Sequence, residues 1–457
     1  MASASILWSI RSRRRPMSTP PCPCAAIRPW APARSASARR RSAGRPISAW
    51  CARWRTRLSI GGNDMSVVYL DHSATTPADP RVVEAMIPFL GGIYGNPSSL
   101  HTVGREARAA VLTARAQVAA LIGARPEDIV FTASGTEADN LAILGSYEAR
   151  ESQDFALAVS AIEHPAVLAP ARAVERRGAA LEIVPVDGQG TVDPDRLALA
   201  FARRPAIALV SVMAANNVVG TLQALEDLGQ VAHENGALFH TDAIQAAGKV
   251  AIDVRTLPVD MLSLSAHKLH GPKGVGALYL RPGVALHPII HGGGQERGLR
   301  SATENVAAIV GFGKAAEIAL AEGAAEADRL RVLRDHILAE VTRRLPNAYL
   351  LGHPSERLPG HLCLGFAGQE GEAIRLLMAL DQEGIAVSSG SACSAHRVAE
   401  PSYVLQAMGL DAFQARGSLR VTLGRFTTAA EIERFLEVLP RVVGELRSIS
   451  TRRFATS

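Results

Sequence analysis

The chain has 457 residues, of which 47% are hydrophobic and 20% charged, so it is long enough for two or three folded domains. Its formal net charge of +6 would suit a nucleic-acid or membrane partner, but the charge is unevenly distributed. Residues 1–64 contain thirteen arginines and one acid, whereas the remaining residues contain 36 basic and 42 acidic side chains. The body of the chain is therefore acidic, and we expect it to bind no nucleic acid.

Residues 1–64 differ from the body in composition as well as in charge. They hold seven prolines, all four tryptophans and three of the five cysteines, and we predict a disordered basic extension. Three origins stay open: translation that starts naturally at Met65, organellar targeting, and a basic arm that binds nucleic acid. Cys22, Cys24 and Cys51 have no spacing typical of a zinc site.

The body contains only Cys363 and Cys393, which excludes a disulfide framework and favours a reducing compartment such as the cytoplasm. Its longest uncharged stretch, residues 205–225, includes two asparagines and a glutamine. Such a stretch is too polar to cross a bilayer, so we expect no membrane partner.

From residue 128 to about 280, short apolar runs alternate with segments of helical length and periodicity. The runs predict buried strands at 129–132, 155–159, 207–213, 237–240 and 261–264, and the segments between them predict helices such as 165–177 and 225–235. This alternation is typical of an α/β fold with a doubly wound, mainly parallel sheet. A charged helix at 325–344, strands near Cys363 and Val421, and a helix from 428 to about 446 predict a smaller α+β domain.

Polar residues follow each of the five predicted strands. They are Ser134-Gly135-Thr136, Glu163-His164, Asn216-Asn217, Asp242 with Gln245, and Ser265-Ala266-His267-Lys268. The carboxyl ends of parallel strands face one crevice, where such sheets bind their ligands. We therefore expect a site that combines an acid, an imidazole and a lysine.

These residue types suit pyridoxal phosphate (PLP). Gly135 and Thr136 at a helix start offer N–H groups to a phosphate, although the same segment would also serve as a helix cap. Lys268 follows a buried strand, where desolvation favours the neutral amine that a Schiff base requires. Asp242, on the preceding strand end, would keep a pyridine nitrogen protonated.

Six segments in chain order carry a family resemblance. They are YLDHSATTP (69–77), GNPSSLH (95–101), SAHK (265–268), HGGGQERGLR (291–300), SSGSAC (388–393) and LRVTLGRFT (419–427). They resemble the cysteine desulfurases of the NifS/IscS type, a class V branch of the fold-type I PLP enzymes. The resemblance extends from Val67 to about Leu446, and implies a large PLP-binding domain over 79–320 and a small domain formed by 65–78 and 321–457.

The resemblance implies a role for each matching residue. The catalytic residues would be Lys268, which carries the cofactor, His164, which stacks on its ring and handles protons, and Cys393. The cofactor contacts would come from Gly135, Thr136, His164, Asn217, Asp242, Gln245, Ser265, His267, Lys268 and, across a homodimer, Thr303. Asn217 and Arg420 would bind the substrate carboxylate, to which a guanidinium fork is suited. Two simpler interpretations stay open, because Arg420 could merely pair with an acid and His164 could merely cap a helix.

The implied reaction converts L-cysteine to L-alanine and leaves a persulfide on Cys393, which lies among small polar residues typical of an exposed loop. The sulfur would pass to an acceptor such as an iron–sulfur scaffold protein, and Cys393 is a candidate transient ligand of that cluster. Cys363 alternates with leucines and is expected in a core strand. The alternative is a selenocysteine lyase or another PLP-dependent lyase or aminotransferase for small amino acids, which would need no thiol on a loop.

Three features depart from the family pattern. Val218 stands where the family has glutamate, Ala302 stands where it has glycine, and the stretch after Cys393 is one residue longer. We expect Ala302 to stiffen the segment that presents Thr303.

We predict that removing residues 1–64 leaves folding and PLP binding unchanged, because their composition is separate and the resemblance begins at Val67. The check compares soluble yield, cofactor absorbance and desulfurase rate between the full chain and a chain that starts at Met65. A shortened protein that cannot fold or bind PLP would show that the extension is required.

Overall fold

The computed structural model describes residues 67–150, 155–204, 206–370, 372–390 and 400–455. The predicted extension at 1–64 and Cys393 lie outside these residues.

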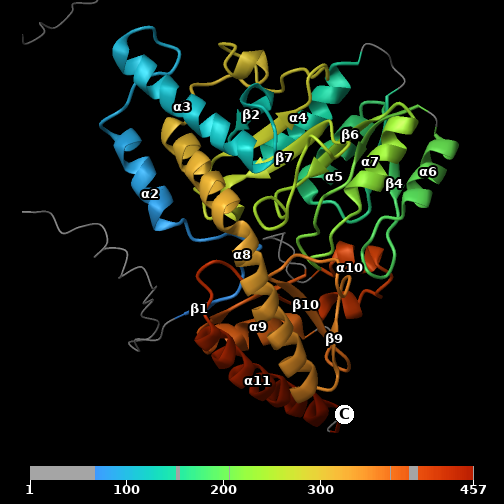
Figure 1. Ribbon diagram of the computed structural model, residues 1–457. Helices are drawn as coiled ribbons and strands as arrows, with labels where there is room; N and C mark the ends of the chain where they lie inside the picture. The colour runs from blue at the N-terminus through green and yellow to red at the C-terminus, as the bar shows by residue number, and fades with distance from the viewer. Residues whose placement is uncertain (1–66, 151–154, 205, 371, 391–399, 456–457) are drawn as a thin grey trace, which may run out of the picture. The chain divides into compact units, whose positions relative to one another are not determined.

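In the described part of the chain, the largest sheet has seven strands in the order β2-β8-β7-β6-β5-β3-β4 (Figure 1). The strands are β2 (Ile129–Thr132), β3 (Ala156–Ser160), β4 (Ala180–Val184), β5 (Ile207–Ser211), β6 (Leu238–Asp242), β7 (Met261–Ser265) and β8 (Gly276–Leu280). Strand β8 pairs antiparallel with both of its neighbours, β2 and β7, and the other pairs in this sheet are parallel. The other six strands therefore point the same way, and their carboxyl ends share one edge of the sheet.

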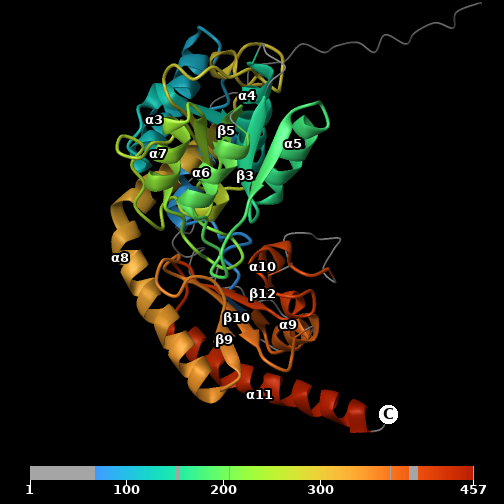
Figure 2. The ribbon, with the colours of Figure 1, turned by 90° about the vertical axis from the view of Figure 1, so that its right-hand side faces the viewer.

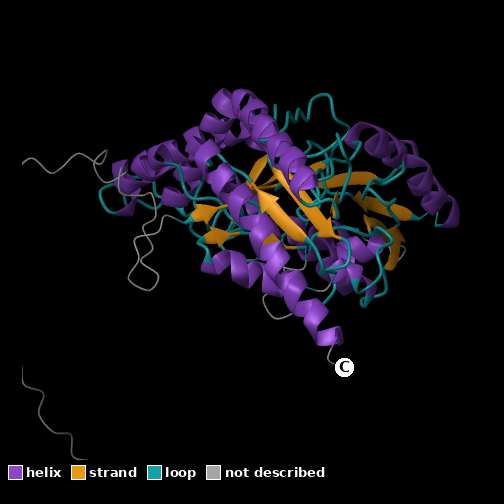
Figure 3. Cartoon of the chain, turned by 90° about the horizontal axis from the view of Figure 1, so that it is seen from below, coloured by secondary structure: helices purple, strands orange, loops and turns teal. Residues whose placement is uncertain are grey.

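Helices cover both faces of this sheet, because its strands carry apolar side chains on both sides (Figures 2 and 3). One face packs against α4 (Gly135–Glu148) and α5 (Pro165–Glu175). The other face packs against α3 (Thr102–Leu121), α6 (Pro194–Arg203), α7 (Leu225–Glu234) and the first half of α8 (Val306–Arg344). The predicted α/β class and mainly parallel sheet are confirmed.

A second hydrophobic core lies around two smaller sheets, one of order β12-β13-β10-β9 and one formed by β1 and β11. Their strands are β1 (Val68–Tyr69), β9 (Ala348–Leu350), β10 (His361–Phe366), β11 (Ile385–Ala386), β12 (Ser388–Ser389) and β13 (Leu419–Thr422). The helices α9 (Ala373–Gln382) and α11 (Ala429–Ala455) pack on this core, whereas α10 (Tyr403–Ala407) contributes Val404 and Leu405 to the core around the large sheet. Cys363 is fully buried in β10, in agreement with its alternation with leucines.

Helix α8 contributes to both cores. Its first half packs on the large sheet through residues such as Phe312, and its second half packs on the small core through Ile337 and Val341. The predicted domain boundary at 320/321 falls inside this helix, and the domain bounds stay a prediction.

The remaining short elements are α2 (Pro80–Met86) and the 3-10 turns η1 (Ile87–Leu90), η2 (Pro126–Asp128), η3 (Ala266–Lys268), η4 (Glu296–Gly298) and η5 (Gln414–Arg416). A search of the helices in the described residues finds none that is long and apolar enough to span a bilayer.

Candidate active site

The large sheet brings five polar strand ends to one edge. The residues are Ser134 after β2, His164 after β3, Asn217 after β5, Asp242 at the end of β6 and Ser265 at the end of β7. Because these strands run in one direction, the residues that the sequence singles out face a common crevice.

Lys268 lies in the 3-10 turn η3 that follows β7. Its Nζ donates hydrogen bonds to the backbone oxygens of Ser73, at 2.5 Å, and Ala74, at 2.6 Å. The neighbouring His267 contacts the Thr75 hydroxyl through Nδ1 at 3.1 Å, and burial, followed by the charge of Lys268, lowers the pKa of His267 to about 4. The segment from Ser73 to Thr75 therefore lies against Lys268 and His267.

Asp242 is a buried carboxyl at the end of β6, and only 5% of its surface is exposed. Its Oδ1 accepts the backbone N–H of Ile244 at 2.9 Å. Burial raises the pKa of Asp242 to about 6, although this hydrogen bond and the charge of Lys268 oppose the rise. Such a carboxyl gains most from a cation placed beside it, and the protonated ring nitrogen of PLP is such a cation.

The start of α4 forms the cradle that a phosphate would require. A Cβ at Gly135 would lie 2.2 Å from Ile244 Cδ1 and 3.2 Å from Ser265 Cβ, so a side chain here would displace Ile244 and crowd the space beside Ser265. Ser134 caps the helix by accepting the Glu137 N–H at 3.1 Å, while the Thr136 side chain is exposed. The cap therefore uses Ser134 and leaves the first N–H groups of α4 for an anion, so these residues fit PLP.

His164 caps helix α5, because its Nδ1 accepts the backbone N–H of Ala166 at 3.1 Å. Burial, followed by the charge of Lys268, lowers the pKa of His164 to about 4. The ring is therefore neutral near pH 7, and its proton is on Nε2 because Nδ1 acts as the acceptor. The cap interpretation is correct, and it leaves an N–H donor on the ring edge that faces away from α5.

Arg420 on β13 is buried, with 2% of its surface exposed. Its Nη2 donates to Asp71 Oδ1 at 2.8 Å, and its Nη1 donates to the backbone oxygen of Asn217 at 3.0 Å. Its Nε is buried and finds no hydrogen-bond partner among the described residues. The predicted pairing with an acid is thus present, and the third donor is one that a carboxylate would satisfy.

Three further predicted residues differ in their surroundings. Gln245 is buried, and its Nε2 donates to the Ser73 backbone oxygen at 2.9 Å. Thr303 is exposed on the loop before α8, with no hydrogen bond to this group among the described residues. The third, Cys393, cannot be placed here because it lies outside the described residues.

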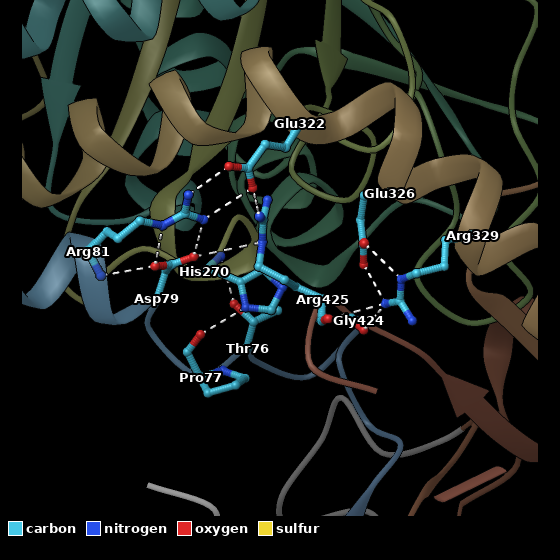
Figure 4. Close-up of polar contacts among 10 residues, drawn as sticks. All are labelled: Thr76, Pro77, Asp79, Arg81, His270, Glu322, Glu326, Arg329, Gly424 and Arg425. Atoms are coloured by element: carbon cyan, nitrogen blue, oxygen red, sulfur yellow. Dashed lines mark hydrogen bonds and ion pairs between the residues drawn. The ribbon is translucent and has the colours of Figure 1, made fainter. Parts of the chain in front are cut away.

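A network of ion pairs fixes the loop after β13 beside this site (Figure 4). Glu322 of α8 binds Arg81, at 2.6 Å, and also Arg425. Hydrogen bonds from Arg81 and Arg425 lower the pKa of Glu322 to about 2, so this link stays charged. Arg329 adds a hydrogen bond to the Gly424 backbone oxygen at 3.1 Å, which ties the same loop to α8.

Sequence reasoning missed three residues that shape the site. Ser73 acts through its backbone oxygen, which has no signal in the sequence. Asp71 pairs with the buried Arg420. The available signal was that this acid lies within the 69–77 segment and could pair with that arginine. Lys249 reaches Gln245 from the loop after β6, and its spacing of four residues from that glutamine was the only hint.

The fold and the polar strand ends at this edge fit the class of enzymes that bind PLP at the carboxyl end of a mainly parallel sheet. The family model "Aminotransferase class-V" matches residues 68–435, and the chain belongs to that family. A cysteine desulfurase IscS of Dictyoglomus turgidum is 48% identical over 383 residues, which cover 84% of this chain and 96% of that protein.

Solved structures agree with this assignment. A NifS-like protein superposes with a TM-score of 0.77 at 38% identity, covering 83% of this chain and 99% of that chain. A structure described as SspA in complex with cysteine has a TM-score of 0.68 at 33% identity, covering 79% of this chain and 99% of that chain.

We predict that Ala302→Gly raises the free energy of unfolding by about 1 kcal/mol, because Ala302 has a φ of 141°, a conformation in which a side chain is strained. Chemical denaturation measures the change. The matched control is Ala324→Gly, an exposed position with helical backbone in α8, where the same exchange costs about 1 kcal/mol. Equal losses at both positions would contradict strain at Ala302.

We predict that the cofactor-free protein loses about 4 kcal/mol of unfolding free energy between pH 6 and pH 5. Burial lowers the pKa of six histidines, which take up protons near pH 6.5 only after unfolding: His72, His164, His240, His267, His270 and His361. Burial raises the pKa of three carboxyls, whose effect has the opposite sign: Asp139, Glu163 and Asp242. The histidines take up more protons on unfolding than the carboxyls release. The unfolded state therefore binds more protons in this pH range, and acidification favours unfolding.

Urea titrations at the two pH values test this balance. A free energy of unfolding that stays constant or increases on acidification would show that the carboxyls outweigh the histidines.

Proposed function

We propose that this protein is a PLP-dependent cysteine desulfurase that converts L-cysteine to L-alanine and transfers the sulfur to Cys393. The observation that carries the proposal is the placement of Lys268 and Asp242 at adjacent strand ends, close enough for the charge of Lys268 to lower the pKa of Asp242, beside the first turn of α4. The 48% identical relative named cysteine desulfurase supports the same activity.

The residues that would hold the cofactor are those described above. Lys268 would bind it covalently, Asp242 would pair with the ring nitrogen, and Gly135, Thr136, Ser265 and His267 would surround the phosphate. When bound, PLP supplies an electron sink for the bond that breaks at the substrate Cα. His164 would present its Nε2–H to the reacting atoms, so its first task there is to donate a proton rather than to accept one.

Arg420 would bind the substrate carboxylate, together with Asn217. Its two Nη atoms are held by Asp71 and by the Asn217 backbone oxygen, which fixes the plane of the guanidinium group before substrate arrives. A guanidinium group held in this way binds a carboxylate with little further loss of side-chain entropy.

The sulfur transfer balances without an added oxidant. The Cys393 thiolate attacks the substrate sulfur, the Cβ–S bond of cysteine breaks, and an S–S bond forms on Cys393. The carbon fragment takes up a proton and leaves as alanine. The persulfide would then supply an acceptor such as an iron–sulfur scaffold protein, and Cys393 would serve as a transient cluster ligand there.

The working unit would be a cytoplasmic homodimer in which Thr303 completes the cofactor site of the neighbouring subunit. The exposure of Thr303 supports this arrangement. Exposed apolar side chains between α2 and α3, including Leu90, Tyr94 and Leu100 at 70%, 77% and 84%, would be covered by a second copy. The buried free thiol of Cys363 is compatible with a reducing compartment.

We predict that Cys393→Ala binds PLP and L-cysteine normally but releases almost no alanine, because the substrate sulfur has no acceptor. The measurements are cofactor absorbance with and without cysteine, and alanine release per folded molecule. Wild-type protein given cysteine without reductant should gain one sulfur atom on the peptide that contains Cys393, as seen by mass spectrometry.

The matched control is Cys363→Ala, which removes a thiol from the core and should keep alanine release per folded molecule near that of the wild type. Normal desulfuration by Cys393→Ala would rule out the persulfide mechanism and favour a selenocysteine lyase or another β-elimination enzyme.

A further inference from the structure

Lys249 is a lysine inside the molecule that none of the predicted roles uses. It lies on the loop between β6 and β7, and its side chain lines a cavity of about 60 Å³ whose wall also includes Lys268. No carboxylate pairs with it in the described part of the chain; its hydrogen-bond partner is the neutral side chain of Gln245. Lys249 is partly buried, and withdrawing an ammonium group from water without a counter-ion is costly, so its surroundings are informative.

A chain of hydrogen bonds joins the two lysines. Lys249 Nζ donates to Gln245 Oε1 at 3.1 Å, and Gln245 Nε2 donates to the Ser73 backbone oxygen at 2.9 Å. The same oxygen accepts from Lys268 Nζ at 2.5 Å. Lys249 is thus connected to the cofactor lysine through one side chain and one carbonyl.

The donors and acceptors in this series of hydrogen bonds determine the orientation of the Gln245 side-chain amide. An ammonium group only donates and a carbonyl only accepts, so Oε1 must face Lys249 and Nε2 must face Ser73. One N–H of Nε2 then bonds to Ser73, and no described residue accepts the other, which can therefore bond to an acceptor on a ligand. The ring oxygen of PLP, which Gln245 would contact by family resemblance, is such an acceptor.

We propose that Lys249 is a positioning residue that acts on the PLP site through Gln245, holding its amide donor toward the ring oxygen and adding positive charge beside Lys268. This inference rests on the proposed PLP chemistry and extends it to a residue outside the six motifs.

The charges around the cavity support an effect of Lys249 on Lys268. The groups that face the two lysines there are His72, His270, Glu326, His361, Arg420 and Arg425. Burial keeps the three imidazoles neutral near pH 7, because it lowers the pKa of each. The two arginines and Glu326 already have oppositely charged partners: Asp71, Glu322 and Arg329.

Among the described residues, no carboxylate pairs with Lys249, whose hydrogen-bond partner is the neutral side chain of Gln245. Burial, followed by repulsion from Lys268 and Arg420, lowers the pKa of Lys249 to about 7. Repulsion is mutual, so a proton on Lys249 disfavours a proton on Lys268. His164, Asp242 and His267 also interact with the charge of Lys268. The charge of Lys249 is the last of the causes that lower the pKa of His267, and burial is the first, so we expect this imidazole to stay neutral near pH 7 when Lys249 is substituted.

The test is a pH titration of the absorbance of lysine-linked PLP in the holoenzyme, without cysteine. For Lys249→Met we expect the midpoint to rise by about one pH unit, a roughly tenfold change in proton affinity, because both a hydrogen bond to the ring oxygen and a positive charge are lost. Lys249→Arg, which keeps the charge and the donors, should restore a midpoint near that of the wild type. Lys273→Met removes an exposed lysine from the nearby turn and should leave the midpoint unchanged.

A double-mutant cycle tests the route through Gln245. If Lys249 acts through that amide, Lys249→Met should shift the titration midpoint less in the Gln245→Leu protein than in the wild type. Competitive acetylation of the cofactor-free protein gives a second readout, in which the Lys268 amine of Lys249→Met should be less reactive near pH 8.

An unchanged midpoint in folded Lys249→Met holoenzyme, or a fully additive double mutant, would overturn the proposal. The proposed function fails by a different observation, namely wild-type holoenzyme that releases no alanine from cysteine, so the two outcomes are distinguishable.

Discussion

The site depends on the segment from Tyr69 to Pro77, which is hydrogen-bonded through its backbone to both hydrophobic cores. Toward the small core, Leu70 donates to Ala386 at 2.8 Å and accepts from the Thr422 N–H at 2.8 Å. Toward the large sheet, Ser73 and Ala74 accept from Lys268, and the Thr76 N–H donates to His267 at 3.0 Å. The position of this segment therefore sets where the cofactor lysine lies relative to the small core.

The same segment determines where Arg420 can act. Asp71 holds one Nη of Arg420, and Ser73, two residues later, accepts from Lys268. The proposed carboxylate site and the proposed cofactor site are thus spaced by a short stretch of backbone rather than by two domains that move independently. The ion pairs of Glu322 with Arg81 and Arg425 fix the loop after Arg420 to α8, which is itself part of both cores.

The sequence predicts the strands that are buried on both faces, because continuous apolar runs leave few alternatives. The run at 129–132 matches β2 to the residue, the run at 155–159 begins and ends one residue before β3, and the run at 261–264 ends one residue before β7. The antiparallel strand β8 was missed, although only ten residues separate it from β7, too few for the crossover that a parallel pair needs. Strand β4 was missed because it is only partly buried and has a charged residue, Glu182, at its centre.

The candidate site could be predicted only in part. Side chains with distinctive chemistry, such as Asp242, Lys268 and His164, stand directly after apolar strands, and the topology of a parallel sheet then brings them together. The contribution of Ser73 could not be predicted, because a backbone oxygen is the same at every residue. Lys249 could not be distinguished from surface lysines, because its burial results from the packing of α8 and the loop after β13 around one cavity.

Burial keeps several groups near Lys268 neutral. Each remaining charge therefore has a larger effect on the pKa values of its neighbours. The pKa of each surrounding imidazole lies well below neutral, so near pH 7 these histidines carry no charge that would offset the others. Asp242 stays close to the point where it gains or loses its proton, since burial raises its pKa to about 6. In such surroundings a cation bound at Asp242 and an anion bound at the start of α4 would each shift the charge state of the other groups. The site is therefore organised so that its ionisation is completed by the ligand, and a single additional lysine in the cavity wall is enough to influence it.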